Sequence, residues 1–167
     1  GTGRIGKGVV QRAAGFNMNI LANDAYPDHA FLERFGGQYV DLDRIYREAD
    51  FITIHAPLTD TTNNMINERV LSMMKPTAVL INAARGGIVD EAALYMALKE
   101  HRIYGAALDA TEIEPACGSP LALLDNCILT PHAGAATREA SLKMGLLAAQ
   151  NVIDVLRGKK CQYIVNE

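Results

Sequence analysis

The sequence lacks a strong net charge and any long apolar run. Its formal net charge is −3 over 167 residues, which gives no electrostatic basis for binding nucleic acid or an anionic membrane. No apolar stretch approaches the ~20 residues that a membrane-spanning helix needs, and no signal peptide opens the sequence. We therefore expect a cytoplasmic protein that binds neither nucleic acid nor membranes.

Paired cysteines are also missing. The three cysteines, Cys117, Cys127 and Cys161, are widely spaced and form no CxxC pair. This spacing favours reduced thiols over a disulfide framework. A catalytic cysteine is the less favoured alternative, because no motif surrounds any of the three. We expect no metal site.

What the sequence does contain is a regular alternation of apolar strands and amphipathic helices. Strands are expected at residues 18–23, 38–40, 51–55, 78–83, 104–109 and 127–130. Helices are expected at residues 5–15, 28–35, 42–49, 67–74, 90–101 and 137–157. Such alternation implies βαβ units, so we predict an α/β fold with a doubly wound parallel sheet, the Rossmann architecture.

Residues 1–6, GTGRIG, have the glycine pattern of a dinucleotide-binding loop. Gly1 permits the tight turn, Gly3 lets the backbone approach a pyrophosphate, and Gly6 lets the next helix pack close to the sheet. The helix N-terminus offers N–H groups to the phosphates, and Arg4 adds a positive charge. The strand that should precede this loop is absent from the sequence. We therefore interpret the chain as truncated before its first strand and expect an unpaired seam in the sheet.

Asp24 follows the next expected strand, 18 residues after Gly6. An acid at this place accepts hydrogen bonds from the ribose hydroxyls of NAD and repels the 2′-phosphate of NADP. No basic residue directly follows Asp24. The alternative is that Asp24 only caps a turn. Loop, spacing and strand together favour NAD as the cofactor.

Two motifs follow later strands at their C-terminal ends, the edge at which doubly wound sheets bind ligands. In INAARGGIVD, the guanidinium of Arg85 can bind a carboxylate bidentately and polarise a carbonyl. The alternative is a surface arginine that bonds a helix terminus, and Asp90 is interpreted as a helix N-cap. In LDATEIEP, an acid such as Glu114 could orient a histidine, although a solvated acidic loop is equally compatible with the pattern.

A third motif, LTPHAGAAT, places His132 in a Pro/Gly turn before the last expected helix. Histidine donates and accepts protons near neutral pH, and the turn would fix its direction. His55 also ends a strand, but there we favour packing at the edge of the cofactor over catalysis. His29 and His101 are interpreted as surface residues.

Together these stretches resemble the D-isomer-specific 2-hydroxyacid dehydrogenases, the family of phosphoglycerate, D-lactate, formate and glycerate dehydrogenases. The resemblance runs through nearly the whole chain in the segments GTGRIG, ANDAYP, HAPLTDTT, LINAARGGIVDEAAL, GAALDATEIEP and LTPHAGAAT. One departure is Ala110-Thr111, where family members usually have an aromatic or aliphatic pair. This departure affects packing more than chemistry.

The resemblance implies residue roles. Arg85 would bind the substrate, His132 would be the general acid/base, and Glu114 would be its paired acid. The residues implied to hold the cofactor are Gly1, Gly3, Arg4, Ile5, Gly6, Asp24, Pro57, Thr62, Ala83 and Asp109.

The resemblance also implies a function. We expect an NAD-dependent oxidoreductase that interconverts a D-2-hydroxy acid and its 2-oxo acid by hydride transfer, acting as a homodimer. Residues 1–167 would be a partial NAD-binding domain, with the helix at 136–157 crossing toward a substrate domain that is absent from the sequence. Two alternatives stay open: an NAD-sensing, corepressor-like binding protein and an inactive fragment.

Overall fold

The computed structural model of the chain describes residues 1–161, 163 and 164. The chain divides into two compact units, Gly1–Pro131 and His132–Glu167, and each is described by itself. The first unit contains every strand of the described chain, together with helices α1 to α5. The second unit contains one long helix, α6 (Arg138–Leu156).

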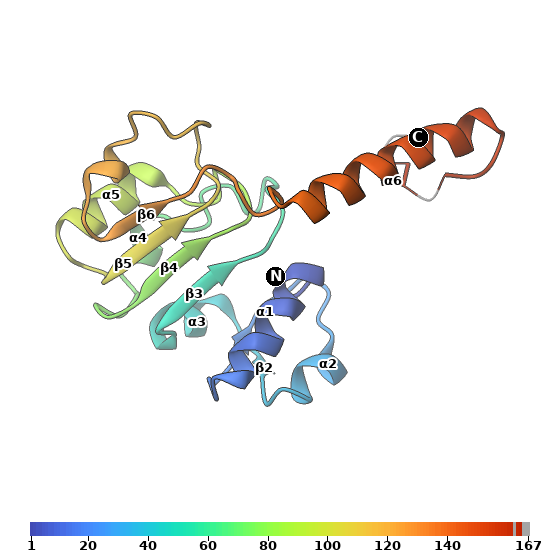
Figure 1. Ribbon diagram of the computed structural model, residues 1–167. Coiled ribbons are helices and arrows are strands. Elements are labelled where there is room, and N and C mark those ends of the chain that lie inside the picture. Colours follow the sequence, from blue (N-terminus) through green and yellow to red (C-terminus); the bar gives the residue numbers. More distant parts are fainter. Residues whose placement is uncertain (162, 165–167) are drawn as a thin grey trace. The chain divides into compact units, whose positions relative to one another are not determined.

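A parallel four-stranded sheet forms the centre of the first unit (Figure 1). Its order is β3 (Phe51–Ile54), β4 (Val79–Asn82), β5 (Gly105–Leu108) and β6 (Cys127–Leu129). The register pairs Ile54 with Asn82 and Asn82 with Leu108, so the carboxyl ends of three strands lie at one level. This confirms the predicted α/β fold with a parallel sheet.

The first two strands form a separate small sheet. β1 (Leu21–Ala22) pairs in parallel with β2 (Gln38–Tyr39), and α1 (Arg4–Gly15) and α2 (His29–Glu33) belong to the same part of the chain. Among the described residues, no strand joins β1 to β3. The unpaired seam that we expected in the sheet therefore lies between β1 and β3.

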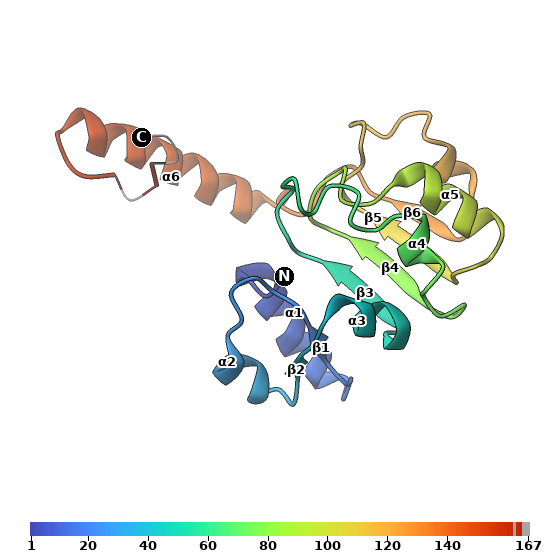
Figure 2. The ribbon, with the colours of Figure 1, turned by 180° about the vertical axis from the view of Figure 1, so that it is seen from behind.

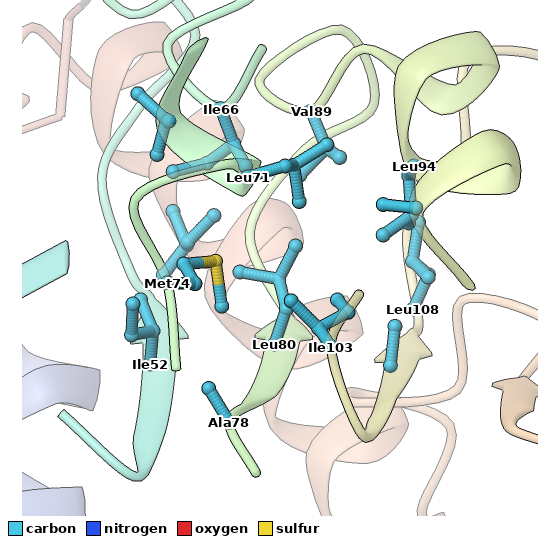
Figure 3. Packing of buried hydrophobic residues seen from close by; sticks show 14 of the residues in the cluster. Ile52, Ile66, Leu71, Met74, Ala78, Leu80, Val89, Leu94, Ile103 and Leu108 are labelled. Atoms are coloured by element: carbon cyan, nitrogen blue, oxygen red, sulfur yellow. The ribbon is translucent and has the colours of Figure 1, made fainter. Parts of the chain in front are cut away.

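Three helices cover one face of the four-stranded sheet: α3 (Leu42–Glu48), α4 (Glu68–Leu71) and α5 (Glu91–Lys99), as Figure 2 shows. Alternate strand residues point toward these helices because strand side chains alternate between the two faces. Leu80 and Leu94 both belong to this core and have no exposed surface (Figure 3). The core therefore fixes the strand ends from which the candidate site is built.

Polar N-caps start most of the helices. Asp28, Asp41, Asn67, Asp90 and Thr137 each accept a bond from the backbone N–H three residues later. The interpretation of Asp90 as a helix cap is thus confirmed. Helix α1 differs, because its N-cap is a glycine with no side-chain capping bond.

Every expected strand and helix is present. All are shorter than the sequence suggested except α1, which begins one residue earlier than expected, at Arg4. A short 3₁₀ helix, η1 (Pro120–Leu123), was not expected, and its Leu121 is fully buried in the main core. Helix α6 buries none of its residues, and Leu142 and Leu146 are more than 60% exposed, at 61% and 62%. In the described chain, no helix combines the length and apolar character required to cross a membrane.

Candidate cofactor and catalytic site

The glycine loop is packed tightly at the carboxyl end of β3. A Cβ added to Gly1 would lie 2.6 Å from the carbonyl oxygen of His55, and one added to Gly6 would lie 2.1 Å from the carbonyl oxygen of Gly1. Neither position has room for a side chain. A Cβ on Gly3, by contrast, would meet nothing within 4 Å. The loop is therefore held closely on its inner side and open at Gly3.

Helix α1 starts directly from this open side. Because Gly3 supplies no side chain as a cap, the first N–H groups of the helix are not satisfied by capping. Such groups, together with the helix dipole, suit a phosphate. Arg4 and Ile5 are exposed on the first turn. The loop thus fits the pyrophosphate of a dinucleotide, as the sequence predicted.

Asp24 lies against the glycine loop. Its Oδ2 accepts bonds from the backbone N–H and, at 3.2 Å, from the hydroxyl of Thr2. Its Oδ1 accepts the N–H of Tyr26 at 2.8 Å, so Asp24 does cap a turn, and its bond to the cofactor ribose stays a prediction. Burial alone would raise the pKa of Asp24, but the bonds from Tyr26 and Thr2 lower the pKa below its ordinary value.

A tyrosine that the sequence did not single out completes this corner. The Tyr39 hydroxyl lies 2.7 Å from the hydroxyl of Thr2 and accepts the backbone N–H of Asp28 at 3.0 Å. Lys7 of α1 forms an ion pair with Asp28. No local pattern marks Tyr39, because its partners lie 11 and 37 residues away.

The segment after β3 carries two more of the expected cofactor residues. The Thr62 hydroxyl donates to the carbonyl oxygen of Pro57 at 2.7 Å and accepts the N–H of Thr59 at 2.8 Å. These bonds fold residues 57–62 into a compact turn next to the strand end. Pro57 is exposed and Thr62 is half-buried, so the turn has a surface available to a ligand.

The turn after β4 presents Arg85. The buried side chain of Asn82 holds this turn, because its Nδ2 donates to the Arg85 carbonyl at 2.8 Å and its Oδ1 accepts the Ala84 N–H at 3.1 Å. Ala83 and Arg85 are exposed. The Arg85 guanidinium donates to the Ala84 carbonyl at 2.6 Å, which leaves further N–H donors for an anion.

The loop after β5 lies directly against that turn. The Asp109 N–H donates to the Asn82 carbonyl at 2.9 Å, and the Asp109 carboxylate accepts the Thr130 hydroxyl at 2.5 Å. A Cβ on Gly86 would lie 2.0 Å from the Thr111 carbonyl oxygen, so only glycine allows this approach. Glu114 is exposed at the end of the loop.

A second tie, also missed in the sequence, holds the same loop to α5. Glu91 and Glu112 exchange bonds reciprocally: the N–H of Glu91 donates to Glu112 at 3.1 Å, and the N–H of Glu112 donates to Glu91 at 2.6 Å. Burial raises the pKa of Glu91, and the charge of Glu112 adds to this effect. The loop that carries Glu114 is thereby fixed at two points.

His132 begins the second unit, and its backbone has a left-handed conformation with φ of 52°. The expected pairing of His132 with Glu114 stays a prediction. His55 is half-buried, and its Nε2 lies 2.9 Å from the Thr53 hydroxyl. Its carbonyl group lies against Gly1 of the glycine loop. Burial lowers the pKa of His55.

Residues expected to bind the cofactor and to bind the substrate thus share one edge of the first unit. Along this edge lie the glycine loop, the turn at 57–62, the Arg85 turn and the loop at 109–114. Within the described ranges, no three His, Cys, Asp or Glu side chains come together as ligands for a metal ion. The exposed Arg85 therefore lies at the same edge as the glycine loop, and the binding roles expected of both stay predictions.

Comparison with known proteins decides the family. Residues 1–134 match the model of the D-isomer specific 2-hydroxyacid dehydrogenase, NAD binding domain. The chain belongs to this family. NAD is the cofactor of the domain, in agreement with the prediction from the glycine loop and Asp24.

The relatives differ in the substrates that their names state. The chain is 46% identical to a D-3-phosphoglycerate dehydrogenase of Methanocaldococcus jannaschii, covering 99% of this chain and 32% of the relative. It is also 46% identical to a glyoxylate reductase of Pyrococcus furiosus, covering 100% and 50%. The chain therefore spans about a third to a half of the length of these relatives.

Solved structures agree with this assignment. The crystal structure of a D-lactate dehydrogenase with NAD+ from Lactobacillus jensenii has a TM-score of 0.90 at 33% identity, covering 100% of this chain and 54% of that one. A holo form of the D-mandelate dehydrogenase of Rhodotorula graminis has a TM-score of 0.92 at 29% identity, covering 100% and 50%. The doubly wound fold is thus shared over the whole chain.

Proposed function

We propose that the full-length protein is an NAD-dependent dehydrogenase that interconverts a D-2-hydroxy acid and its 2-oxo acid. One observation carries this proposal. The glycine loop, the Arg85 turn and the loop of Asp109 and Glu114 lie along the same edge of the first unit. The relatives' names give several substrates, so the proposal is limited to the class of acid.

The cofactor is held in this proposal by residues of the first unit. The N–H groups at Gly3 and the first turn of α1 receive the pyrophosphate, with the exposed Arg4 beside it. Asp24 accepts a ribose hydroxyl. Ala83 and Asp109 hold the nicotinamide end, because both follow adjacent strand ends. The remaining members of the set are Gly1, Ile5, Gly6, Pro57 and Thr62.

Two side chains act on the substrate, and a third supports one of them. Arg85 binds the carboxylate bidentately and polarises the neighbouring carbonyl. His132 takes the hydroxyl proton when the acid is oxidised and returns it to the carbonyl oxygen on reduction. Glu114 pairs with the imidazolium and stabilises its charged form. The NAD that these residues would hold would supply the acceptor for the hydride from C2 of the hydroxy acid, and NADH would supply the donor for the reverse reaction.

The rest of the proposed assembly follows from the family. Helix α6 crosses to a substrate-binding part of the full-length protein, which would cover Leu142, Leu146, Ala149 and Ile153. We further propose a cytoplasmic homodimer that binds no nucleic acid and no membrane. The exposure of the apolar residues on α6 supports a partner surface there.

The test measures turnover by the full-length protein with NADH and a panel of 2-oxo acids. The loss of NADH absorbance monitors the reaction. Reduction of at least one 2-oxo acid, with the D-isomer of the hydroxy acid as product, is expected. NADH binding with no turnover across the panel would contradict the enzyme proposal and favour an NAD-sensing binding protein.

A further inference from the structure

Asp24 is one end of a chain of hydrogen bonds that passes under the glycine loop. The chain runs from the Asp28 N–H to the Tyr39 hydroxyl at 3.0 Å, then to the Thr2 hydroxyl at 2.7 Å, and on to the Asp24 carboxylate at 3.2 Å. Thr2, in its middle, is buried, with 7% of its surface exposed. The chain links β2, the glycine loop and the segment after β1.

The chemistry of its two ends fixes the direction of every bond. A backbone N–H can only donate, so the Tyr39 oxygen accepts from Asp28. An ionised carboxylate can only accept, so the Thr2 hydroxyl donates to Asp24. The Tyr39 hydroxyl hydrogen is then left to point at Thr2. The lowered pKa of Asp24 is consistent with a carboxylate that stays ionised as the final acceptor.

The same chain of hydrogen bonds determines how many acceptor positions of the Asp24 carboxylate are available to a ligand. A carboxylate has about four acceptor positions. Three are used, by the N–H and hydroxyl of Thr2 and by the N–H of Tyr26. These three bonds fix the direction of the remaining acceptor position, because a rotation of the carboxylate would break them.

We propose that Tyr39 is a positioning residue for the cofactor: through Thr2, its hydroxyl orients Asp24 and so sets the preference for NAD over NADP. The inference rests on the proposed role of Asp24 and extends it to a residue on the neighbouring strand. Tyr39 itself touches no cofactor in this proposal. Its ring packs against His29 at 5.0 Å between ring centroids, a contact that phenylalanine would keep.

The experiment measures dissociation constants for NADH and NADPH in the full-length protein by fluorescence titration. Tyr39→Phe should weaken NADH binding about five-fold, the effect of one lost hydrogen bond, and change NADPH binding by less than about two-fold. Thr2→Val should have the same selective effect, because it breaks the same chain. Thr2→Ser, which keeps the hydroxyl, should bind NADH as the wild type does.

The double variant Tyr39→Phe/Thr2→Val separates positioning from general damage. Two substitutions that break the same chain of hydrogen bonds give losses of NADH affinity that do not add. The double variant should therefore bind NADH no more weakly than Thr2→Val alone. Tyr26→Phe is the matched control, since this nearby tyrosine is 89% exposed and its backbone alone contacts Asp24. The control should leave both dissociation constants unchanged.

Equal weakening of NADH and NADPH binding by Tyr39→Phe, or additive losses in the double variant, would overturn the inference. Asp24→Ala distinguishes this failure from failure of the proposed cofactor site. If Asp24→Ala removes the preference for NADH and Tyr39→Phe does not, only the role of Tyr39 is wrong. If Asp24→Ala leaves the preference unchanged, the role of Asp24 is wrong as well.

Discussion

The side-chain amide of Asn82 donates to the carbonyl oxygen of Arg85 at 2.8 Å and is itself almost fully buried, with 1% of the residue exposed. A second, longer bond from the same nitrogen reaches the Ala110 carbonyl at 3.4 Å. One side chain thus joins the turn that carries Arg85 to the loop that leads to Glu114. We therefore expect the spacing of Arg85 and Glu114 to depend on Asn82.

Replacing Asn82 with alanine should therefore damage both stability and turnover. The substitution leaves buried backbone groups without partners, which costs about 1–3 kcal/mol of unfolding free energy. Turnover should fall with a raised KM for the oxo acid, because Arg85 loses its fixed position. Chemical denaturation and steady-state kinetics measure the two effects. Asn151→Ala, on helix α6, is the control, and equal behaviour of the two variants would refute the role of Asn82.

Gly86 offers a sharper test of the same contact. A Cβ there would lie 2.0 Å from the Thr111 carbonyl oxygen, so Gly86→Ala must push the Arg85 turn away from the acidic loop. We expect a loss of about 1–3 kcal/mol in stability and a marked fall in turnover.

The matched control for this change is Gly15→Ala at the end of helix α1. A Cβ at Gly15 would meet nothing within 4 Å, and alanine favours the helix by up to about 1 kcal/mol. The control should be neutral or slightly more stable. A Gly86→Ala variant as stable and active as this control would show that the close approach is unnecessary.

His132→Gln should abolish turnover in the full-length protein and leave NADH affinity within about two-fold of the wild type, because the general acid/base acts on the substrate. Rapid mixing and fluorescence titration separate the two measurements. Substantial activity in the variant would remove His132 from the proposed mechanism. Weakened NADH binding would instead place this residue in the cofactor site.

His55 should make the folded protein sensitive to mild acid. Burial holds its pKa below the ordinary value of 6.5, so the unfolded chain takes up the proton first as the pH falls. The unfolded state is then favoured, and stability should decrease from about pH 6.5 down to the lowered pKa of the folded state. Above that window His55 is neutral in both states and contributes no pH dependence.

Denaturation curves between about pH 7 and pH 5 check this expectation. His55→Gln should show a smaller loss of stability over the window than the wild type. His101→Asn, at an exposed histidine with φ of 53°, should retain the wild-type slope. The same slope in His55→Gln and the wild type would exclude His55 as the source of the acid sensitivity.

Much of the fold and part of the candidate site could be predicted from local patterns. The order of strands and helices follows from alternating apolar and amphipathic segments, and Asp90 was recognisable as a cap from its place before a helix. The bounds of the elements were too generous, since strand ends depend on pairing with a neighbour. The 3₁₀ helix η1 was missed because it is short and is fixed by the burial of Leu121.

Local motifs in the sequence were enough to predict the family, the parallel α/β architecture and NAD as the cofactor. These depend on short motifs whose glycines and charged residues are adjacent in the chain. Only the tertiary structure revealed the links of Tyr39 with Thr2, of Asn82 with Ala110, and of Glu91 with Glu112. Each joins residues 21 to 37 positions apart, so it exists only once the strand register and the packing of the loops have brought them together.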